Sequence, residues 1–143
     1  MEQIEYVKNK EQILAIIISH KFSEKGIHFF TPDEFSQQLA YMNHPSGKII
    51  EPHFHNPVHR NVVYTQEVLL IKKGLLRIDF YDDNQSFLES RSLHSGDVIL
   101  ISSGGHGFEV IEDVEMIEVK QGPYQGDNDK TRFIPLKAKQ TSL

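Results

Sequence analysis

Residues 47–74 read GKIIEPHFHNPVHRNVVYTQEVLLIKKG, and the interpretation of the whole chain depends on this stretch. His53 and His55 stand two residues apart, and on an extended segment such positions point to the same side, so both imidazoles can address one point in space. Glu67 lies inside an apolar run, with six residues between it and Gly74. Because a carboxylate is costly to bury alone, a neighbouring cation is the economical partner. The stretch therefore points to a metal site.

A second stretch, residues 96–110, reads GDVILISSGGHGFEV and places His106 after a glycine-rich turn. In these two stretches the chain resembles the cupin superfamily. The first cupin motif is a glycine, five residues, His-x-His, and then a glutamate followed six residues later by glycine. The second motif is a glycine-led strand and turn ending in a histidine. The metal ligands that this resemblance implies are His53, His55, Glu67 and His106.

One spacing departs from the family pattern. Eleven residues separate His55 from Glu67, where cupins usually have three or four. His59 lies in this longer segment and is a possible substitute for Glu67 as the fourth ligand. Three imidazoles and a carboxylate suit one divalent ion of iron, manganese, nickel, cobalt, copper or zinc, and these donors do not choose among the metals. The chain also resembles small uncharacterised bacterial cupins, some of them associated with surface-polysaccharide pathways, which implies no established reaction.

Length and composition predict one domain. A chain of 143 residues is long enough to bury a stable hydrophobic core without disulfides or a structural metal. The absence of cysteine excludes disulfides and thiolate metal sites. Within the single domain, residues 1–36 are predicted to form an N-terminal helix and strand extension. Residues 37–120 are predicted to form the barrel core, and residues 121–143 a C-terminal tail.

The charge pattern favours a small-molecule ligand. The formal net charge is −5 and there is no long basic run, so the sequence offers no electrostatic footprint for nucleic acid or an anionic membrane. We expect no membrane span either, because the longest apolar run is far shorter than the roughly 20 residues that a membrane helix needs. With no N-terminal signal pattern, the predicted location is the cytoplasm.

Hydrophobic patterning predicts mainly β-structure. Residues 10–20 have apolar positions at helical spacing and are predicted to form a helix, although their three consecutive isoleucines leave a strand as the alternative. Residues 37–43 and 48–55 are predicted to form a hairpin that places His53 and His55 on a strand. A second strand pair, residues 66–71 and 75–81, is expected around a turn at Gly74. Further strands are expected at residues 27–30, 87–93, 98–101, 108–111 and 114–120.

Many short strands separated by turn residues are typical of an all-β sandwich or barrel. The cupin resemblance implies a jelly-roll barrel, the double-stranded β-helix, with the ligand site in its mouth. Residues 67–72 are apolar on both faces, so the outer face of this strand should be covered. The N-terminal helix and a second subunit are the candidates, and a homodimer is the predicted assembly.

Four further residues are candidates for catalysis or substrate binding. Glu118 and Lys120 share one face of a late strand and would be acid, base or anchoring groups if that face points inward, or a solvated ion pair if it points outward. Arg60 and Tyr64 could line the mouth of the barrel or lie on the surface. Glu67 has an alternative as well, a cross-strand pair with Arg60 or with Arg77.

Three functions are compatible with this sequence. The first is a metal-dependent isomerase or epimerase that acts on a small oxygen-rich metabolite such as a sugar or keto acid. The second is an Fe(II)-dependent dioxygenase, and the third a binding module for a metal and a small ligand without catalysis. A sugar isomerase that uses its histidines as acid and base without a metal is a fourth reading.

Overall fold

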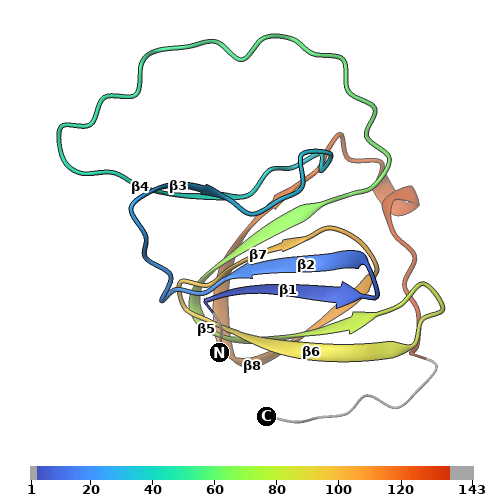
Figure 1. Ribbon diagram of the computed structural model, residues 1–143. Coiled ribbons are helices and arrows are strands. Elements are labelled where there is room, and N and C mark those ends of the chain that lie inside the picture. Colours follow the sequence, from blue (N-terminus) through green and yellow to red (C-terminus); the bar gives the residue numbers. More distant parts are fainter. Residues whose placement is uncertain (1–2, 136–143) are drawn as a thin grey trace.

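A computed structural model describes residues 3–135 and shows an all-β protein built on a curled antiparallel sheet that forms a half-barrel (Figure 1). The described residues contain no α-helix, and therefore no helix long and apolar enough to cross a membrane. The strands are β1 (Ile4–Asn9), β2 (Gln12–Ile18), β3 (Gly26–Phe29), β4 (Ala40–Asn43), β5 (Glu67–Tyr81), β6 (Phe87–His94), β7 (Val98–Ile101) and β8 (Gly105–Lys120). A short 3-10 helix, η1 (Gly126–Asp129), follows β8.

Two long strands, β5 and β8, pair with each other along almost their whole length. On its other side β5 pairs first with β7, through residues 67–70, and then with β6, through residues 75–81. β7 continues through β2 to β1, which gives the order β1-β2-β7-β5-β6, with β8 beside β5. The β5–β8 ladder thus belongs to both halves of the curled sheet.

The turn predicted at Gly74 is wrong, because β5 continues through Gly74 as one strand. In the same way, β8 is a single strand where two strands were predicted, at residues 108–111 and 114–120. The pairing register shifts three times between Ile71 and Leu76, which marks bulges, and bulges bend a strand. Gly74 has φ +93° and lies against the backbone of Asp113 on β8, where a side chain has no room. Glycine at this position therefore allows the ladder to bend where the sequence pattern indicated a chain reversal.

The predicted helix at residues 10–20 is also wrong, since Gln12–Ile18 forms β2. Its five residues from Leu14 to Ile18 are all buried, and the two faces of the strand pack into different clusters. Ala15 and Ile17 face the core inside the curled sheet, while Ile16 and Ile18 face the outer cluster. A strand covered on both faces has a continuous apolar run, which also satisfies helical spacing.

The hairpin predicted for residues 37–43 and 48–55 is not formed. β4 pairs instead with β3, as a separate two-stranded sheet. Residues 44–66 contain no strand and arc away from the curled sheet before they enter β5 (Figure 1). His53 and His55 therefore lie on an irregular segment rather than on a strand.

The chain itself covers much of the outer apolar face that was predicted to need a helix or a second subunit. Ile16, Ile18 and Leu100 form a cluster with Leu39. Phe22, Phe30 and Phe35, from the segment around β3, pack against this cluster. Burying these aromatic side chains removes apolar surface from water on the side opposite the main core.

We expect Gly74→Ala to destabilise the fold far more than Gly26→Ala. Both glycines have a left-handed backbone, φ +93° and +92°, but an added Cβ at Gly26 meets nothing within 4 Å, whereas at Gly74 it collides with the Asp113 carbonyl. The conformational cost alone is roughly 1–2 kcal/mol, and overpacking adds roughly 1–3 kcal/mol. Urea unfolding of the two variants measures the difference, and equal losses would contradict the close contact at the bend.

Candidate functional site

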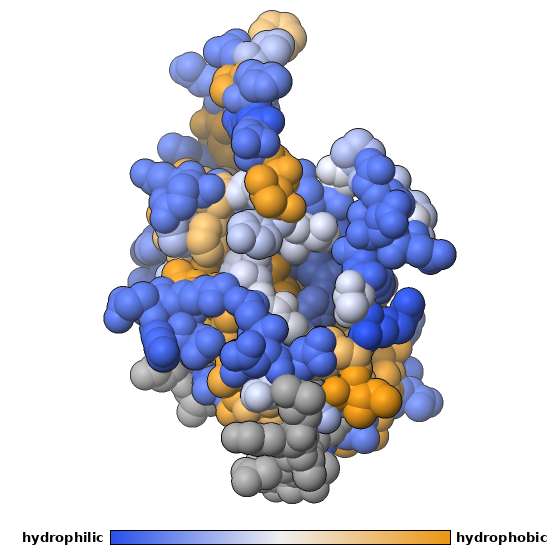
Figure 2. Space-filling view, turned by 90° about the vertical axis from the view of Figure 1, so that its right-hand side faces the viewer, coloured by the Kyte–Doolittle hydropathy of each residue, from blue (hydrophilic) through white to orange (hydrophobic). Residues whose placement is uncertain are grey.

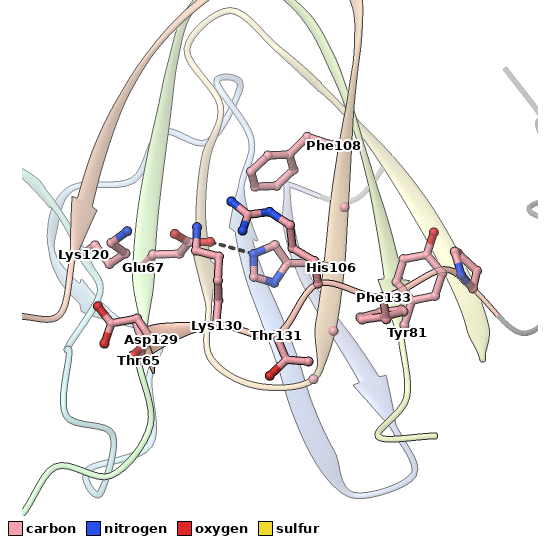
Figure 3. A pocket seen from close by; sticks show the side chains of 15 residues that line it. Thr65, Glu67, Tyr81, His106, Phe108, Lys120, Asp129, Lys130, Thr131 and Phe133 are labelled. Carbon is pink, nitrogen blue, oxygen red and sulfur yellow. Dashed lines mark ion pairs between the residues drawn. The ribbon is translucent and has the colours of Figure 1, made fainter. Parts of the chain in front are cut away.

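A cavity of about 990 Å³ opens where the ends of β5 and β8 meet the C-terminal segment. Its polar lining comes from both strands and from residues 129–132, and its apolar lining includes three aromatic rings. Figure 3 shows these side chains around the opening. The polar residues used below are Thr65, Glu67, His106, Lys120, Asp129, Lys130, Thr131 and Arg132.

Glu67 and His106 form the centre of this cavity. Glu67 begins β5 opposite Lys120, whereas His106 lies near the start of β8 opposite Phe80, far along the same ladder. The bend in the ladder brings these two ends together, so that Nε2 of His106 lies 2.8 Å from Oε1 of Glu67 (Figure 3). Two of the four ligands that the cupin resemblance implied are thus adjacent, from opposite ends of the β5–β8 ladder.

The electrostatics of Glu67 follow from its neighbours. The hydrogen bond with His106 is the main cause that lowers the pKa of Glu67 to about 2, although burial acts in the opposite direction. A hydrogen bond with Glu118 and the charge of Lys120 lower it further. The same contact with Glu67 raises the pKa of Glu118. Glu67 is therefore ionised at neutral pH, and Glu118 holds its proton more firmly than an ordinary glutamate.

The two nitrogens of His106 differ. Nε2 faces the carboxylate, whereas Nδ1 is buried and has no hydrogen-bond partner among the described residues. A hydrogen bond from Nε2–H to Glu67 satisfies one nitrogen and leaves the buried Nδ1 without a partner. A metal-bound imidazole, by contrast, usually donates its other N–H to an acceptor, and residues 3–135 provide none at Nδ1.

Cations and aromatic rings complete the lining. Lys120 lies 3.8 Å from Glu118, and Lys130 and Arg132 reach the cavity from the C-terminal segment. Phe133 packs edge-on against Tyr81, with ring centroids 5.3 Å apart, which holds this segment beside β5. Phe133 could be predicted from the sequence as an apolar anchor of the tail, but Lys130 and Arg132 could not be assigned to the site, because a tail without periodicity gives no signal of where it folds back. Residues 136–143 of the predicted tail lie outside the described part of the chain.

The remaining predicted site residues lie outside this cavity. His53, His55, His59, Arg60 and Tyr64 are all exposed on the 44–66 segment, and none of them lines it. The rings of His53 and His55 do lie close together, with centroids 5.1 Å apart. Across residues 3–135, no three His, Cys, Asp or Glu side chains are grouped so that they could hold a metal ion.

The structure also decides between the alternatives for Glu67 and for the late strand. Arg77 pairs with Asp79 at 3.2 Å and with Glu109 at 2.6 Å, so it is not the partner of Glu67. Glu118 and Lys120 form an ion pair, which agrees with the outward alternative, but Lys120 lines the cavity and Glu118 lies close enough to Glu67 to affect its pKa. Lys120 therefore belongs to the cavity lining, and Glu118 lies beside it.

No family model, no curated protein and no solved structure matches this chain. The chemistry of the site has to be argued from its own residues.

We expect the pKa of the Glu67 carboxyl, about 2 in the wild-type protein, to rise toward its ordinary value in His106→Ala, which removes the main cause of the shift. Because the folded-state pKa is the lower one, ionised Glu67 stabilises the fold fully above about pH 4.5 and loses this effect as the pH falls through about 2. A carboxyl-carbon NMR titration measures the pKa. His94→Ala, a change to an exposed histidine outside the cavity, serves as the control.

Proposed function

We propose that this cavity binds a small, oxygen-rich, anionic metabolite, such as a sugar phosphate, an acidic sugar or a keto acid, and isomerises or epimerises it by proton transfer. The observation that carries the proposal is the Glu67–His106 pair, 2.8 Å apart in a cavity that three cationic side chains also line. An acid–base pair with cations beside it suits substrates that develop negative charge on oxygen.

The lining supports recognition of such a ligand. Lys120, Lys130 and Arg132 offer positive charge for a carboxylate or phosphate, and the guanidinium can bind either group through two hydrogen bonds. The hydroxyls of Thr65 and Thr131 can exchange hydrogen bonds with sugar hydroxyls. The cavity volume of about 990 Å³ falls within the range of small-molecule sites.

The reaction needs no net oxidation. A carbon–hydrogen bond next to the substrate carbonyl breaks, its proton joins the Glu67–His106 pair, and the electron pair moves to the carbonyl oxygen to give an enediolate. In an isomerisation, the hydroxyl proton next to the carbon that lost its hydrogen passes to the former carbonyl oxygen, that hydroxyl oxygen becomes the new carbonyl, and the pair returns its proton to the former carbonyl carbon. In an epimerisation, an acid on the opposite face gives a proton to the same carbon, and the pair keeps the proton that it removed until the product leaves. Lys120 and Lys130, which line the cavity, can stabilise the enediolate oxygen.

The divalent ion that the cupin resemblance implies is only partly matched within one chain. Glu67 and His106 supply one oxygen and one nitrogen donor, which suit a transition-metal ion. His53, His55 and His59 lie outside the cavity, and Nδ1 of His106 lacks an acceptor among the described residues. The single chain therefore does not fit a complete metal centre, and the proton transfer above depends on none.

Binding and proton transfer can be tested separately. In a thermal-shift screen of sugars, sugar phosphates and keto acids, we expect anionic compounds to raise the melting temperature, because a ligand stabilises the state that binds it. Lys130→Gln should weaken this binding at least severalfold, whereas Lys25→Gln, an exposed lysine outside the cavity, should not. Stabilisation by neutral compounds only would contradict the anionic assignment.

For the best ligand, we expect the protein to catalyse exchange of a carbon-bound proton with deuterium from the solvent, followed by NMR. His106→Gln should retain binding but lose at least about 100-fold in exchange rate, the usual scale of acid–base catalysis. An undiminished exchange rate in His106→Gln would exclude the pair as the proton carrier.

A further inference from the structure

Residues 126–135, which comprise η1 and the chain after it, form a strap along one side of the cavity. The strap carries Lys130 and Arg132, two of the three cations that line the cavity. Figure 3 shows the strap passing beside the Glu67–His106 pair, which belongs to the β5–β8 ladder. The groups that can attract an anion and the groups that can move a proton are therefore carried mainly by different parts of the chain.

Few polar contacts tie the strap to the sheet. Before it, the backbone N–H of Gln121 donates to the carbonyl of Gln66 at 2.9 Å. At its start, the N–H of Gln125 donates to Asp129, which lies in the strap itself. From residue 122 to residue 135, no hydrogen bond to a strand is found in the described part of the chain. Figure 2 shows the side of the molecule on which η1 lies, and the surface there is largely hydrophilic. The strap therefore depends on a few packed side chains for its position.

Phe133 is the residue that packs the strap against the sheet. Its ring meets Tyr81 edge-on, with centroids 5.3 Å apart and planes at 88°. The next residue, Ile134, is 87% exposed, so the strap turns one of two adjacent apolar side chains toward the sheet and the other toward water. The contact of Phe133 therefore decides where Lys130 and Arg132 lie.

Gly105 on β8 provides the room for the Phe133 ring. A Cβ at this position would lie 3.0 and 3.2 Å from two carbons of that ring and 3.2 Å from the Cβ of Tyr81. Gly107, on the same face of β8, is open by comparison, since its Cβ would meet only Tyr81, at 3.9 Å. Neither glycine has a left-handed backbone, so the backbone does not require glycine at either position. The missing side chain of Gly105 is a seat for Phe133.

The two cations of the strap are available to a ligand. Lys130 and Arg132 take part in no ion pair with a described residue. Lys130 nevertheless lies near the ladder: Glu67 raises the pKa of Glu118, and the charge of Lys130 opposes this rise. A carboxylate or phosphate in the cavity would find both charges unpaired.

We propose that Phe133, seated against Gly105 and Tyr81, makes the site selective for anionic substrates. It does so by holding Lys130 and Arg132 at the cavity. Release of the ring leaves the acid–base pair in place, because the curl of the sheet positions that pair, but it removes both cations from the bound substrate. The inference rests on the proposed function and adds the residue that determines which substrate charge the site accepts.

The seat is tested without a ligand by native digestion with trypsin, which cleaves after Lys130. We expect Phe133→Ala to raise the rate of this cleavage at least about tenfold, because loss of the aromatic pair shifts the opening equilibrium of the strap by about that factor. Ile134→Ala, a change to the exposed neighbour, should leave the rate unchanged. Cleavage after Lys25, an exposed lysine elsewhere, monitors the rest of the molecule.

The seat can also be filled from the side of β8. Gly105→Val places two methyl groups where the Phe133 ring lies and should release the strap as Phe133→Ala does, whereas Gly107→Val should not. Wild-type rates of cleavage after Lys130 in Phe133→Ala would show that the ring does not hold the strap and would overturn the seat. Because the two variants act from opposite sides, misfolding of Gly105→Val leaves the decision to Phe133→Ala.

Anion binding is measured with inorganic phosphate as the probe, by NMR titration. We expect the wild-type protein to bind phosphate and Phe133→Ala to bind it at least about tenfold more weakly, since a hydrogen bond to a charged group contributes at least that factor. Ile134→Ala should bind as the wild-type protein does. Absence of phosphate binding by the wild-type protein, or an equal Kd in Phe133→Ala, would overturn the role of the strap in anion recognition.

Selectivity is measured by deuterium exchange into pyruvate and acetone. Each offers a methyl group next to a carbonyl, from which the acid–base pair can remove a proton and to which it can return deuterium, but only pyruvate has a carboxylate. We expect Phe133→Ala to lower kcat/KM for pyruvate at least about tenfold more than for acetone, through KM. An equal loss with both compounds would assign Phe133 a structural role only and overturn its role in specificity.

Failure of the proposed function gives a different result. A wild-type protein that exchanges neither compound would contradict the proton transfer for such carbonyl compounds. The digestion with trypsin and the titration with phosphate would still decide whether Phe133 holds the strap and whether the strap binds an anion.

Discussion

The bend in the β5–β8 ladder is the constraint on which the rest of the structure depends. Gly74 has a left-handed backbone and lies against Asp113 on the facing strand, and the register shifts around it. A straight ladder would hold Glu67 and His106 at opposite ends of β5. The bend lets β5 pair with β7 in one half of the sheet and with β6 in the other, and it brings the carboxylate and the imidazole to 2.8 Å. The site is a direct consequence of how the sheet curls.

Sequence patterning predicted the all-β class and several elements well, because their signals were local. β7 has the predicted bounds and β6 nearly so, each ending at polar or turn residues. Glu67 and His106 were predicted as members of one site and are neighbours. The errors arose where two geometries share one pattern. In β2, Ile16 and Ile17 are buried on opposite faces of the sheet, and a run that is apolar on both faces also fits a helix. At Gly74, a glycine after two lysines indicates a turn as readily as a bulge.

Other features had no local signal. Lys130 and Arg132 enter the cavity because Phe133 packs against Tyr81, a contact that depends on the path of the chain rather than on periodicity. Arg77 alternates with apolar residues as a solvated side chain would, yet it is 2% exposed and pairs with Asp79 and Glu109. A buried guanidinium needs such partners, because an unpaired charge in this position would cost several kcal/mol. Whether a strand face or a side chain is covered depends on the tertiary fold, and this decided both where Lys130 and Arg132 lie and whether Arg77 is buried.

His53 and His55, the histidines that first indicated a metal site, are exposed and lie outside the cavity. His53 and His55 are two residues apart, so on a β-strand both side chains would point to the same side. A strand, however, needs a neighbouring strand, because its backbone N–H and C=O groups must be paired when they are removed from water. The described part of the chain offers these residues no neighbour, and it leaves the first half of β8 without one on its outer side. The Glu67–His106 pair does not depend on these histidines, because the curl of the sheet alone brings its carboxylate and its imidazole to 2.8 Å.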